Sequence, residues 1–306
     1  MNIIVSGSMA YDRIMSFPEY FADHILPDKI HMLNVCFQVD GMTEHFGGTA
    51  GNIAYALRLM GKSPLITATI GQDFHKYFNR LEQFEIATDS IRIIEEEFTA
   101  GAYITTDKAD NQITGFNPGA MKYSSALAFD TIAASNSLLI ASPGNLDDMI
   151  NYPRECKARD IRYIFDPGQA LPVLQAADLL EVIDGCFLLI VNDYEFDLIV
   201  NKTGLGRDDL LRLAANTIIT LGEQGSTLYT NGDATRIAPY APRQVVDPTG
   251  CGDAYRGALL AGLAAGQDLV ASATLGSVCA SFAVEHHGTQ VYTFTPEEFA
   301  ARQQDH

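Results

Sequence analysis

The segment DPTGCGD, residues 247–253, combines a carboxylate with two closely spaced glycines and stands directly before a run of small apolar residues. Proline and glycine predict a turn here, and the residues that follow predict a helix at 253–265. Gly250, Cys251 and Gly252 would then place three consecutive backbone amides at the start of a helix, where the helix dipole favours a bound anion. Because glycine has no side chain, two of these positions leave room for a phosphate.

Asp253 projects from the first turn of this predicted helix. A carboxylate beside an anion site is electrostatically unfavourable unless it has a task, and accepting a proton from a nucleophile that attacks the bound group is such a task. The alternative is that Asp253 only caps the helix. Cys251 stands where a thiolate would be stabilised, but no histidine is close in sequence to activate it. We interpret it as a small residue packed into the turn.

A second glycine pair precedes another predicted helix, in the segment HFGGTAGNIAYAL. Gly47 and Gly48 permit close approach of the backbone to a ligand, and Asn52 offers both a donor and an acceptor, which suits a hydroxyl-rich molecule. The alternative is an ordinary glycine turn with an asparagine near the helix start. Ser8 and Asp12 follow the first predicted strand, and Asp12 can accept two hydroxyl hydrogen bonds, as a sugar diol requires.

Two further polar segments follow predicted buried strands. In VNDYE, Asn192 and Glu195 are three residues apart, so on a helix they would share a face and could hold hydrated Mg²⁺. A capping pair at the start of a surface helix is the alternative. In ITLGEQGS, Gly222 and Gly225 predict a turn whose backbone would accommodate a nucleotide.

Strand-like and helix-like segments alternate along the chain. Short, nearly continuous apolar runs predict buried strands at 2–5, 64–70, 137–141, 163–165, 186–191 and 217–220. Helices are predicted at 51–60, 178–183, 208–215 and 253–265. This alternation predicts a mostly parallel sheet with helices on both faces, in which ligands bind at the carboxyl ends of the strands.

Two regions depart from that order. Residues 31–39 and 102–116 show apolar residues that tend to alternate with polar ones, as half-exposed antiparallel strands do. Together they predict a small flap over one edge of the sheet.

Composition limits the partners. The chain has 306 residues, 47% of them apolar, and a net charge of −18 from 20 basic and 38 acidic residues. We therefore expect neither nucleic acid nor an anionic membrane as the main partner.

The first residues do not resemble a signal peptide and no run is long enough to span a membrane. Five scattered cysteines indicate neither a disulfide framework nor a zinc site, so a soluble, cytoplasmic protein is expected.

These motifs resemble those of the PfkB carbohydrate-kinase family, also called ribokinase-like. The glycine-pair segment at 47–52 and DPTGCGD at 247–253 match its two signatures in the expected order. NxxE at 192–195 and TLG at 220–222 fall where that family has its magnesium and nucleotide segments. The segments GSMAYDRIMSFP, HILPD, NQITGFNPGAM and VNDYEFDLI resemble the bacterial adenosine kinase branch.

The resemblance implies a single domain over 1–306: a ribokinase-like three-layer α/β/α sandwich with a mostly parallel sheet and a small β-sheet lid, formed by about 13–45 and 98–118. It implies that Asp253 is the catalytic base and that Gly250, Cys251 and Gly252 form an anion hole. The residues it implies for nucleoside binding are Ser8, Asp12, Gly47, Gly48, Asn52, Phe116, Met121 and Gln169. Those it implies for ATP and ions are Asn192, Thr220, Gly222 and Gly225 for the nucleotide, Asn192 and Glu195 for Mg²⁺ through water, and Asp247 and Thr249 for a monovalent cation such as K⁺.

The chain also departs from that branch. Where some of its adenosine kinases have an aromatic residue that stacks on the base, the alignment places Ala102, with Tyr103 beside it. A second glutamine after Gln169 is replaced by Ala170. Such a roomier pocket resembles that of bacterial nucleoside kinases that also accept inosine or guanosine.

We therefore expect transfer of the γ-phosphoryl of ATP to the 5′-hydroxyl of a purine nucleoside. The alternatives are a broad-specificity inosine or guanosine kinase, a ribokinase-type sugar kinase, and a nucleoside-binding sensor without catalysis. Phe116 and Met121 favour a base over a bare sugar, and the intact GCGD and NxxE motifs argue against a sensor. The edges of the flap could pair between subunits, so a homodimer through the lid is a further expectation.

Overall fold

A computed structural model of the protein describes residues 1–304. In this part of the chain a nine-stranded sheet has the order β13-β12-β11-β10-β9-β8-β1-β4-β5. Its strands are β1 (Asn2–Ser6), β4 (Leu65–Gly71), β5 (Ile91–Ile94), β8 (Ser137–Ala141), β9 (Arg162–Phe165), β10 (Leu188–Asn192), β11 (Asn216–Thr220), β12 (Ser226–Thr230) and β13 (Asp233–Ile237). The strands from β5 to β11 run parallel, and β12 and β13 add an antiparallel edge. The predicted mostly parallel sheet is confirmed.

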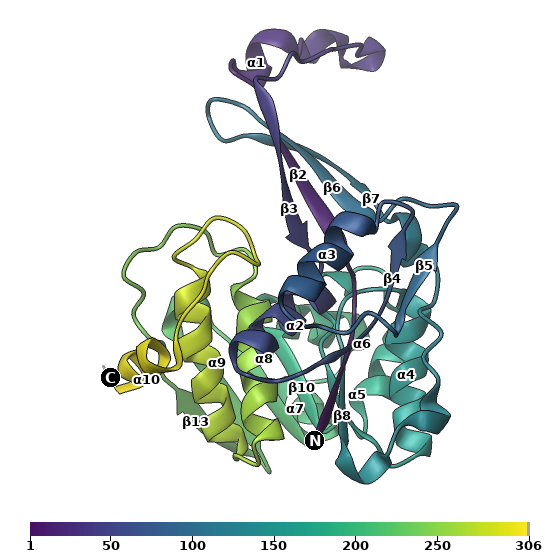
Figure 1. Ribbon diagram of the computed structural model, residues 1–306, viewed down its shortest axis with the longest axis vertical. Helices are drawn as coiled ribbons and strands as arrows, with labels where there is room; N and C mark the ends of the chain where they lie inside the picture. The colour runs from purple at the N-terminus through teal and green to yellow at the C-terminus, as the bar shows by residue number, and fades with distance from the viewer. Residues whose placement is uncertain (305–306) are drawn as a thin grey trace.

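Helices cover both faces of this sheet (Figure 1). One layer holds α2 (Thr49–Leu59), α3 (His75–Gln83), α8 (Cys251–Ala264) and α9 (Leu269–Ala283), with α10 (Pro296–Gln304) beside α9. The other layer holds α4 (Leu146–Ala158), α5 (Ala176–Ile183), α6 (Asp193–Thr203) and α7 (Arg207–Leu213). Neighbouring strand residues point to opposite layers: Val5 packs in the core with α2 and α8, and Ile4 in the core with α4 and α5. Since both faces are buried there, central strands such as β1 and β8 are apolar along nearly their whole length, as the sequence indicated.

Helices α2 and α8 lie unusually close together. Gly257 of α8 faces α2 so closely that an added Cβ would come within 2.8 Å of the backbone oxygen of Ile53 and would collide with the Cβ of Ala56. A side chain at residue 257 would therefore force the two helices apart. Their amino ends carry Asn52 and Asp253, so this close packing sets how near those two residues lie.

A separate four-stranded sheet projects from the body with α1 (Phe21–His24) at its far end (Figure 1). Its order is β3-β2-β6-β7, with β2 (Ala10–Ser16), β3 (Gly41–Gly47), β6 (Ala100–Thr106) and β7 (Gln112–Asn117). Strand β2 runs parallel to β6 and antiparallel to β3, and β6 runs antiparallel to β7. This arrangement completes the expected α/β fold with a second, smaller sheet.

The prediction of a strand at 31–39 is wrong. Residues Pro27–Met32 form a 3₁₀ helix, and residues 33–39 have no regular secondary structure. Strand β2 pairs along its whole length with β3 on one side and with β6 on the other, so the segment before β3 cannot pair with β2. Its apolar side chains still alternate in exposure, because Phe37 packs on the aromatic rings of Phe17 and Phe21.

The remaining short elements are 3₁₀ turns. They are η2 (Gly119–Lys122), η3 (Phe129–Thr131), η4 (Ala134–Asn136), η5 (Gly168–Ala170) and η6 (Gly222–Gln224). No helix within residues 1–304 combines the length and the apolar character needed to cross a membrane.

Candidate active site

Asp253 and Asn52 meet at the amino ends of α8 and α2, although 201 residues separate them in the chain. The Nδ2 of Asn52 donates a hydrogen bond of 2.8 Å to Oδ2 of Asp253. Burial raises the pKa of Asp253, while the nearby guanidinium of Arg256 and the bond from Asn52 oppose that rise. A half-buried carboxylate whose pKa is raised toward neutrality is a suitable proton acceptor.

The start of α8 presents unpaired helix amides beside this carboxylate. Gly250 takes a left-handed conformation, with φ of +79°, that ends the turn and begins the helix. The amide of Cys251 donates back to Pro248 O at 3.2 Å, and the first helical bond runs from Ala254 N to Gly250 O at 2.9 Å. The amides of Gly252 and Asp253 therefore precede the helical ladder, where an anion is favoured.

Cys251 is held as a thiol. Burial, together with the nearby carboxylates of Asp247 and Asp253, raises its pKa to about 11. Its Sγ lies 4.0 Å from the backbone oxygen of Asp247. A thiolate is therefore disfavoured despite the helix start, which agrees with the interpretation of Cys251 as a packed small residue.

A buried ion pair supports the start of α8 from below. Arg256 contacts Asp166, the residue that follows β9, through Nε at 2.6 Å and Nη2 at 2.7 Å. Only 8% of Arg256 and 2% of Asp166 are exposed. These two contacts involve Nε and Nη2 of the guanidinium group. The third nitrogen, Nη1, would lie 2.7 Å from a Cβ added to Gly252. Gly252 is thus a glycine because a cation occupies the space of its side chain.

The glycine pair before α2 is required by the protein's own packing. A Cβ on Gly47 would lie 2.5 Å from Oδ2 of Asp12. Gly48 has φ of +86°, and a Cβ there would lie 2.5 Å from Ser8 O and 2.7 Å from Ala10 N. The missing side chains of these glycines make room for the β1–β2 connection and for the side chain of Asp12; the close approach of a ligand stays a prediction.

Ser8 is tied to the same helix start. Its Oγ accepts a 3.0 Å hydrogen bond from Thr49 N, and its own amide donates to Pro143 O at 2.9 Å. Ser8 is buried, with 8% of its surface exposed. Its side chain therefore connects β1 to α2.

A row of residues in register crosses the small sheet. Asp12 of β2 is paired with His45 on one side and Ala102 on the other, and Ala102 is paired with Phe116 of β7. Directly paired residues point to the same face of a sheet. Burial raises the pKa of Asp12, opposed by His45. Phe116 is 55% exposed on this face, so it has an apolar ring available for a ligand.

Tyr103 belongs to the opposite face, because it is the next residue after Ala102 on the same strand. There it accepts a 2.8 Å hydrogen bond from Nη1 of Arg13. The aromatic ring beside Ala102 is therefore turned away from the row that contains Asp12, and Ala102 leaves that row open.

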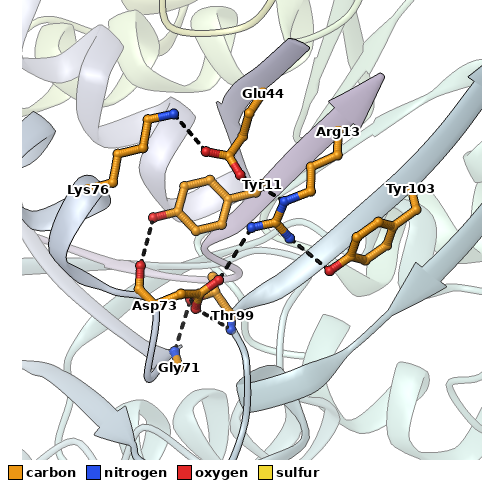
Figure 2. A network of polar contacts seen from close by, with 8 residues as sticks. All are labelled: Tyr11, Arg13, Glu44, Gly71, Asp73, Lys76, Thr99 and Tyr103. Carbon is orange, nitrogen blue, oxygen red and sulfur yellow. Dashed lines mark hydrogen bonds and ion pairs between the residues drawn. The ribbon is translucent and has the colours of Figure 1, made fainter. Parts of the chain in front are cut away.

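The opposite face is fastened to the body by a polar network (Figure 2). Arg13 contacts Glu44 of β3 at 2.7 Å and Asp73, beyond β4, at 3.4 Å. Lys76 of α3 contacts the same Glu44 at 2.7 Å. Asp73 also accepts bonds from the amide and the hydroxyl of Thr99, at 2.8 and 2.6 Å. The base of the small sheet is thus tied to α3 and to the end of β4.

Asn192 and Glu195 form a capping box at the start of α6. Oδ1 of Asn192 accepts from Glu195 N at 2.7 Å, and Oε2 of Glu195 accepts from Asn192 N at 2.8 Å. The capping alternative that the sequence left open is therefore present. The second carboxylate oxygen of Glu195 is not part of this box.

The glycine turn after β11 lies at the same edge of the sheet, since Thr220 is paired with Asn192. Gly222 and Gly225 both have positive φ, at +56° and +82°. Leu221 N donates to Gly225 O at 2.7 Å and closes the turn. An added Cβ on Gly225 would collide with the backbone of β13, so that glycine serves the turn itself.

Three further predicted positions lie on connecting segments. Asp247 accepts from Thr249 N at 2.9 Å and from Gly288 N at 3.3 Å; burial acts against ionisation, but these bonds hold the pKa of Asp247 below its ordinary value. Met121 is half-buried in η2, where its backbone oxygen accepts a 3.1 Å bond from Asn145. Gln169 is exposed in η5, three residues beyond Asp166.

The sequence reading missed several residues around Asp253. Arg256 follows Asp253 by three residues, which on a helix places both on one side, and this spacing was an available signal. Gln290 donates to Asn52 and to Tyr77, which lie 238 and 213 positions away in the chain, and no local pattern marks Gln290 or Tyr77. Within the described residues no cluster of three or more metal-ligating side chains is found.

Such a sheet, with a carboxylate and free helix amides at its carboxyl edge, is the framework of an α/β phosphotransferase. The chain belongs to the pfkB family of carbohydrate kinases, whose model matches residues 11–296. It is 30% identical to a nucleoside kinase of Methanocaldococcus jannaschii over 91% of this chain and 92% of that protein. It is 27% identical to a ribokinase of Bacillus subtilis over 94% of each chain.

Solved structures agree with this assignment. The ligand-free nucleoside kinase of Burkholderia thailandensis has a TM-score of 0.89 and 38% identity, covering 99% of this chain and 100% of that one. The complex of the same kinase described as ADP-inosine has a TM-score of 0.84 and 38% identity, covering 99% and 95%. The expected ribokinase-like fold and the expected kinase class are confirmed.

Arg256→Met should lower the free energy of unfolding by about 3–5 kcal/mol, because it leaves the buried carboxylate of Asp166 without its cation. Urea unfolding followed by circular dichroism at pH 8 measures the change. The double variant Asp166→Leu/Arg256→Met removes both charges and should recover most of the loss. A single variant as stable as the wild type would contradict the buried pair.

Proposed function

We propose that this protein transfers the γ-phosphoryl group of ATP to the 5′-hydroxyl of a purine nucleoside. The observation that carries the proposal is the hydrogen-bonded pair of Asn52 and Asp253 beside the free amides at the start of α8. Membership of the pfkB family and similarity to nucleoside kinases over nearly the whole chain support it.

In this proposal Asp253 accepts the proton of the attacking hydroxyl. An alcohol has a pKa close to that of water, about 15.7, so free alkoxide is negligible at neutral pH. The 5′-oxygen attacks the γ-phosphorus, the bond to the bridging oxygen of ADP breaks, and the hydroxyl proton passes to Asp253 as the new bond forms. The amides of Gly250, Gly252 and Asp253 stabilise the charge on the phosphoryl group during transfer, while the amide of Cys251 donates to Pro248 O. A raised pKa makes Asp253 a better acceptor than an exposed aspartate.

ATP and its ions are assigned to the edge formed by β10, β11 and α8. The backbone turn after Thr220, with Gly222 and Gly225, would hold the nucleotide. Glu195 has a carboxylate oxygen outside its capping box, which suits Mg²⁺ that keeps several waters; Asn192 lies beside it. Bound Mg²⁺ would neutralise phosphate charge. K⁺ is assigned to Asp247 and Thr249, at the turn before α8.

The nucleoside is assigned to the space between α2 and the small sheet. Asp12, Gly48 and Asn52 would hold the ribose hydroxyls, with Ser8 and Gly47 shaping that wall. Phe116, Met121 and Gln169 would contact the base. Because Ala102 is small and Tyr103 faces the other way, the pocket suits several purines, including inosine and guanosine as well as adenosine.

Asp253→Asn should lower kcat by more than about a hundredfold, since an amide cannot accept the proton, while nucleoside binding persists. Coupled ADP release measures kcat, and isothermal titration measures nucleoside affinity. Turnover close to that of the wild type would remove Asp253 from this role.

A substrate panel separates the proposed activity from its alternatives. The protein is incubated with Mg-ATP and adenosine, inosine, guanosine, ribose or fructose 6-phosphate, and ADP is quantified. Nucleoside-dependent ADP release is expected. Turnover of sugars alone would favour the ribokinase-type alternative. The 27% identity with a ribokinase is the reason to include sugars in the panel. Nucleoside binding without turnover would indicate a sensor.

Self-association through the small sheet is also part of the proposal. Strands β3 and β7 are its edges, and apolar side chains near its far end are exposed, with Met32 at 73% and Met42 at 58%. Light scattering after size exclusion should give the mass of a dimer, and Met42→Lys, on edge strand β3, should shift the protein toward monomer. A monomer at high micromolar concentration would contradict this assignment.

A further inference from the structure

Asn52, which holds Asp253, is itself held by side chains from two other segments. Its Oδ1 accepts a 3.0 Å hydrogen bond from Nε2 of Gln290. The same Nε2 donates to the hydroxyl of Tyr77 at 2.9 Å, and that hydroxyl donates to the backbone oxygen of Gly47 at 2.7 Å. We call these five residues, Gly47, Tyr77, Gln290, Asn52 and Asp253, the Gln290 relay.

The donor and the acceptor of each hydrogen bond in the relay can be assigned by starting from the backbone oxygen of Gly47. A backbone oxygen only accepts, so Tyr77 must donate to Gly47, and its oxygen is then free to accept from Gln290. Gln290 uses its amide nitrogen for both Tyr77 and Asn52, which fixes Oδ1 of Asn52 on the side of Gln290. The Nδ2 of Asn52 is thereby directed at Asp253.

The relay is buried and has no spare room. Tyr77, Gln290 and Asn52 are 0%, 3% and 5% exposed. A Cβ added to Gly51 would lie 3.0 Å from Nε2 of Gln290 and would collide with the hydroxyl of Tyr77. The backbone oxygen of Gln290 is bound by Arg80 of α3. A buried polar chain that is joined by these hydrogen bonds and anchored through its backbone keeps one arrangement.

We propose that Gln290 is a positioning residue for phosphoryl transfer, one that keeps the donor side of the Asn52 amide on Asp253 and links that orientation, through Tyr77, to Gly47 at the base of strand β3. The proposal rests on the kinase function proposed above. Gln290 acts only through Asn52.

Loss of Gln290 would change the electrostatics of Asp253. With no donor at residue 290, the Asn52 amide can rotate and turn its oxygen toward the carboxylate, which favours the protonated form and raises the pKa of Asp253. The other titratable or charged groups that face Asp253 are left in place by a change at residue 290: Arg256 and Cys251 on α8, Asp166 beyond β9, and Tyr292 on the segment that carries Gln290.

The test is Gln290→Met, which keeps the length of the side chain and removes its donors. Because Asp253 must be ionised to accept a proton, activity is lost as pH falls through its pKa. The acid limb of kcat/KM should therefore move up by about one pH unit. At neutral pH kcat should fall about tenfold, because Asp253 is less well oriented, and KM for ATP should not change.

Thr289→Val is the matched control. Thr289, a buried residue next to Gln290, donates a part-buried 2.7 Å bond to Phe46 O of β3, but no bond links it to Asn52. Thr289→Val should lower the melting temperature, as Gln290→Met does. It should leave the acid limb of the pH profile of kcat/KM unchanged. An equal movement of the acid limb in both variants would overturn the proposal, since it would then reflect general loosening of the segment.

Tyr77→Phe decides the question if Gln290→Met does not fold. It removes the hydroxyl that anchors Gln290 and should move the acid limb in the same direction by less. An unmoved limb in every folded relay variant would overturn the proposal. A ¹³C carboxyl titration of Asp253, recorded without substrate, reports the same pKa shift. It therefore separates a failure of the relay from a wild-type protein that proves not to be a kinase.

Discussion

The hydrogen bond between Asn52 and Asp253 is the contact on which the candidate site depends, because it joins the starts of two helices that meet only in the folded protein. It requires α2 and α8 to approach closely, which the missing side chain of Gly257 allows. Both helices begin at a glycine with positive φ, Gly48 at +86° and Gly250 at +79°. Each of those turns brings its helix to this edge at the angle that places the amide and the carboxylate in contact.

The start of α8 carries local positive potential within a strongly acidic protein. The net charge of −18 would repel a polyphosphate at long range. At short range, helix amides and the guanidinium of Arg256 supply positive potential beneath the turn at residue 252. Asp166 neutralises much of that cation, so the protein alone does not offset the charge of ATP. A bound divalent cation, as the family resemblance implies, would supply the remainder.

Local sequence patterns predicted the parts of the site that local structure forms. The turn and helix at 247–265, the strands that alternate with helices and the segment around Asn192 follow from neighbours in the chain. The prediction of a strand at 31–39 was wrong because alternate side chains of this segment are half-buried without any strand pairing. Alternation of apolar and polar residues indicates which side chains are exposed, and it does not show that the backbone pairs with another strand. Residues such as Tyr77 and Gln290 could not be found, since their contacts span 213 and 238 positions of sequence. Helix α9, in the same layer as α2 and α8, was not predicted, because most of its residues are buried and it shows no distinct polar face.

The two faces of the small sheet carry different kinds of residue, and this difference constrains how it can move. The face with Asp12 and Ala102 carries the exposed ring of Phe116, while the face with Arg13 is fastened to Asp73 and, through Glu44, to α3. Rotation of the whole sheet about its base would break those ion pairs, whereas bending of its far end would not. Gly47 stands at the fastened end and accepts the bond from Tyr77. Its carbonyl therefore stays in place for the relay to Asp253 even if the far end of the sheet bends.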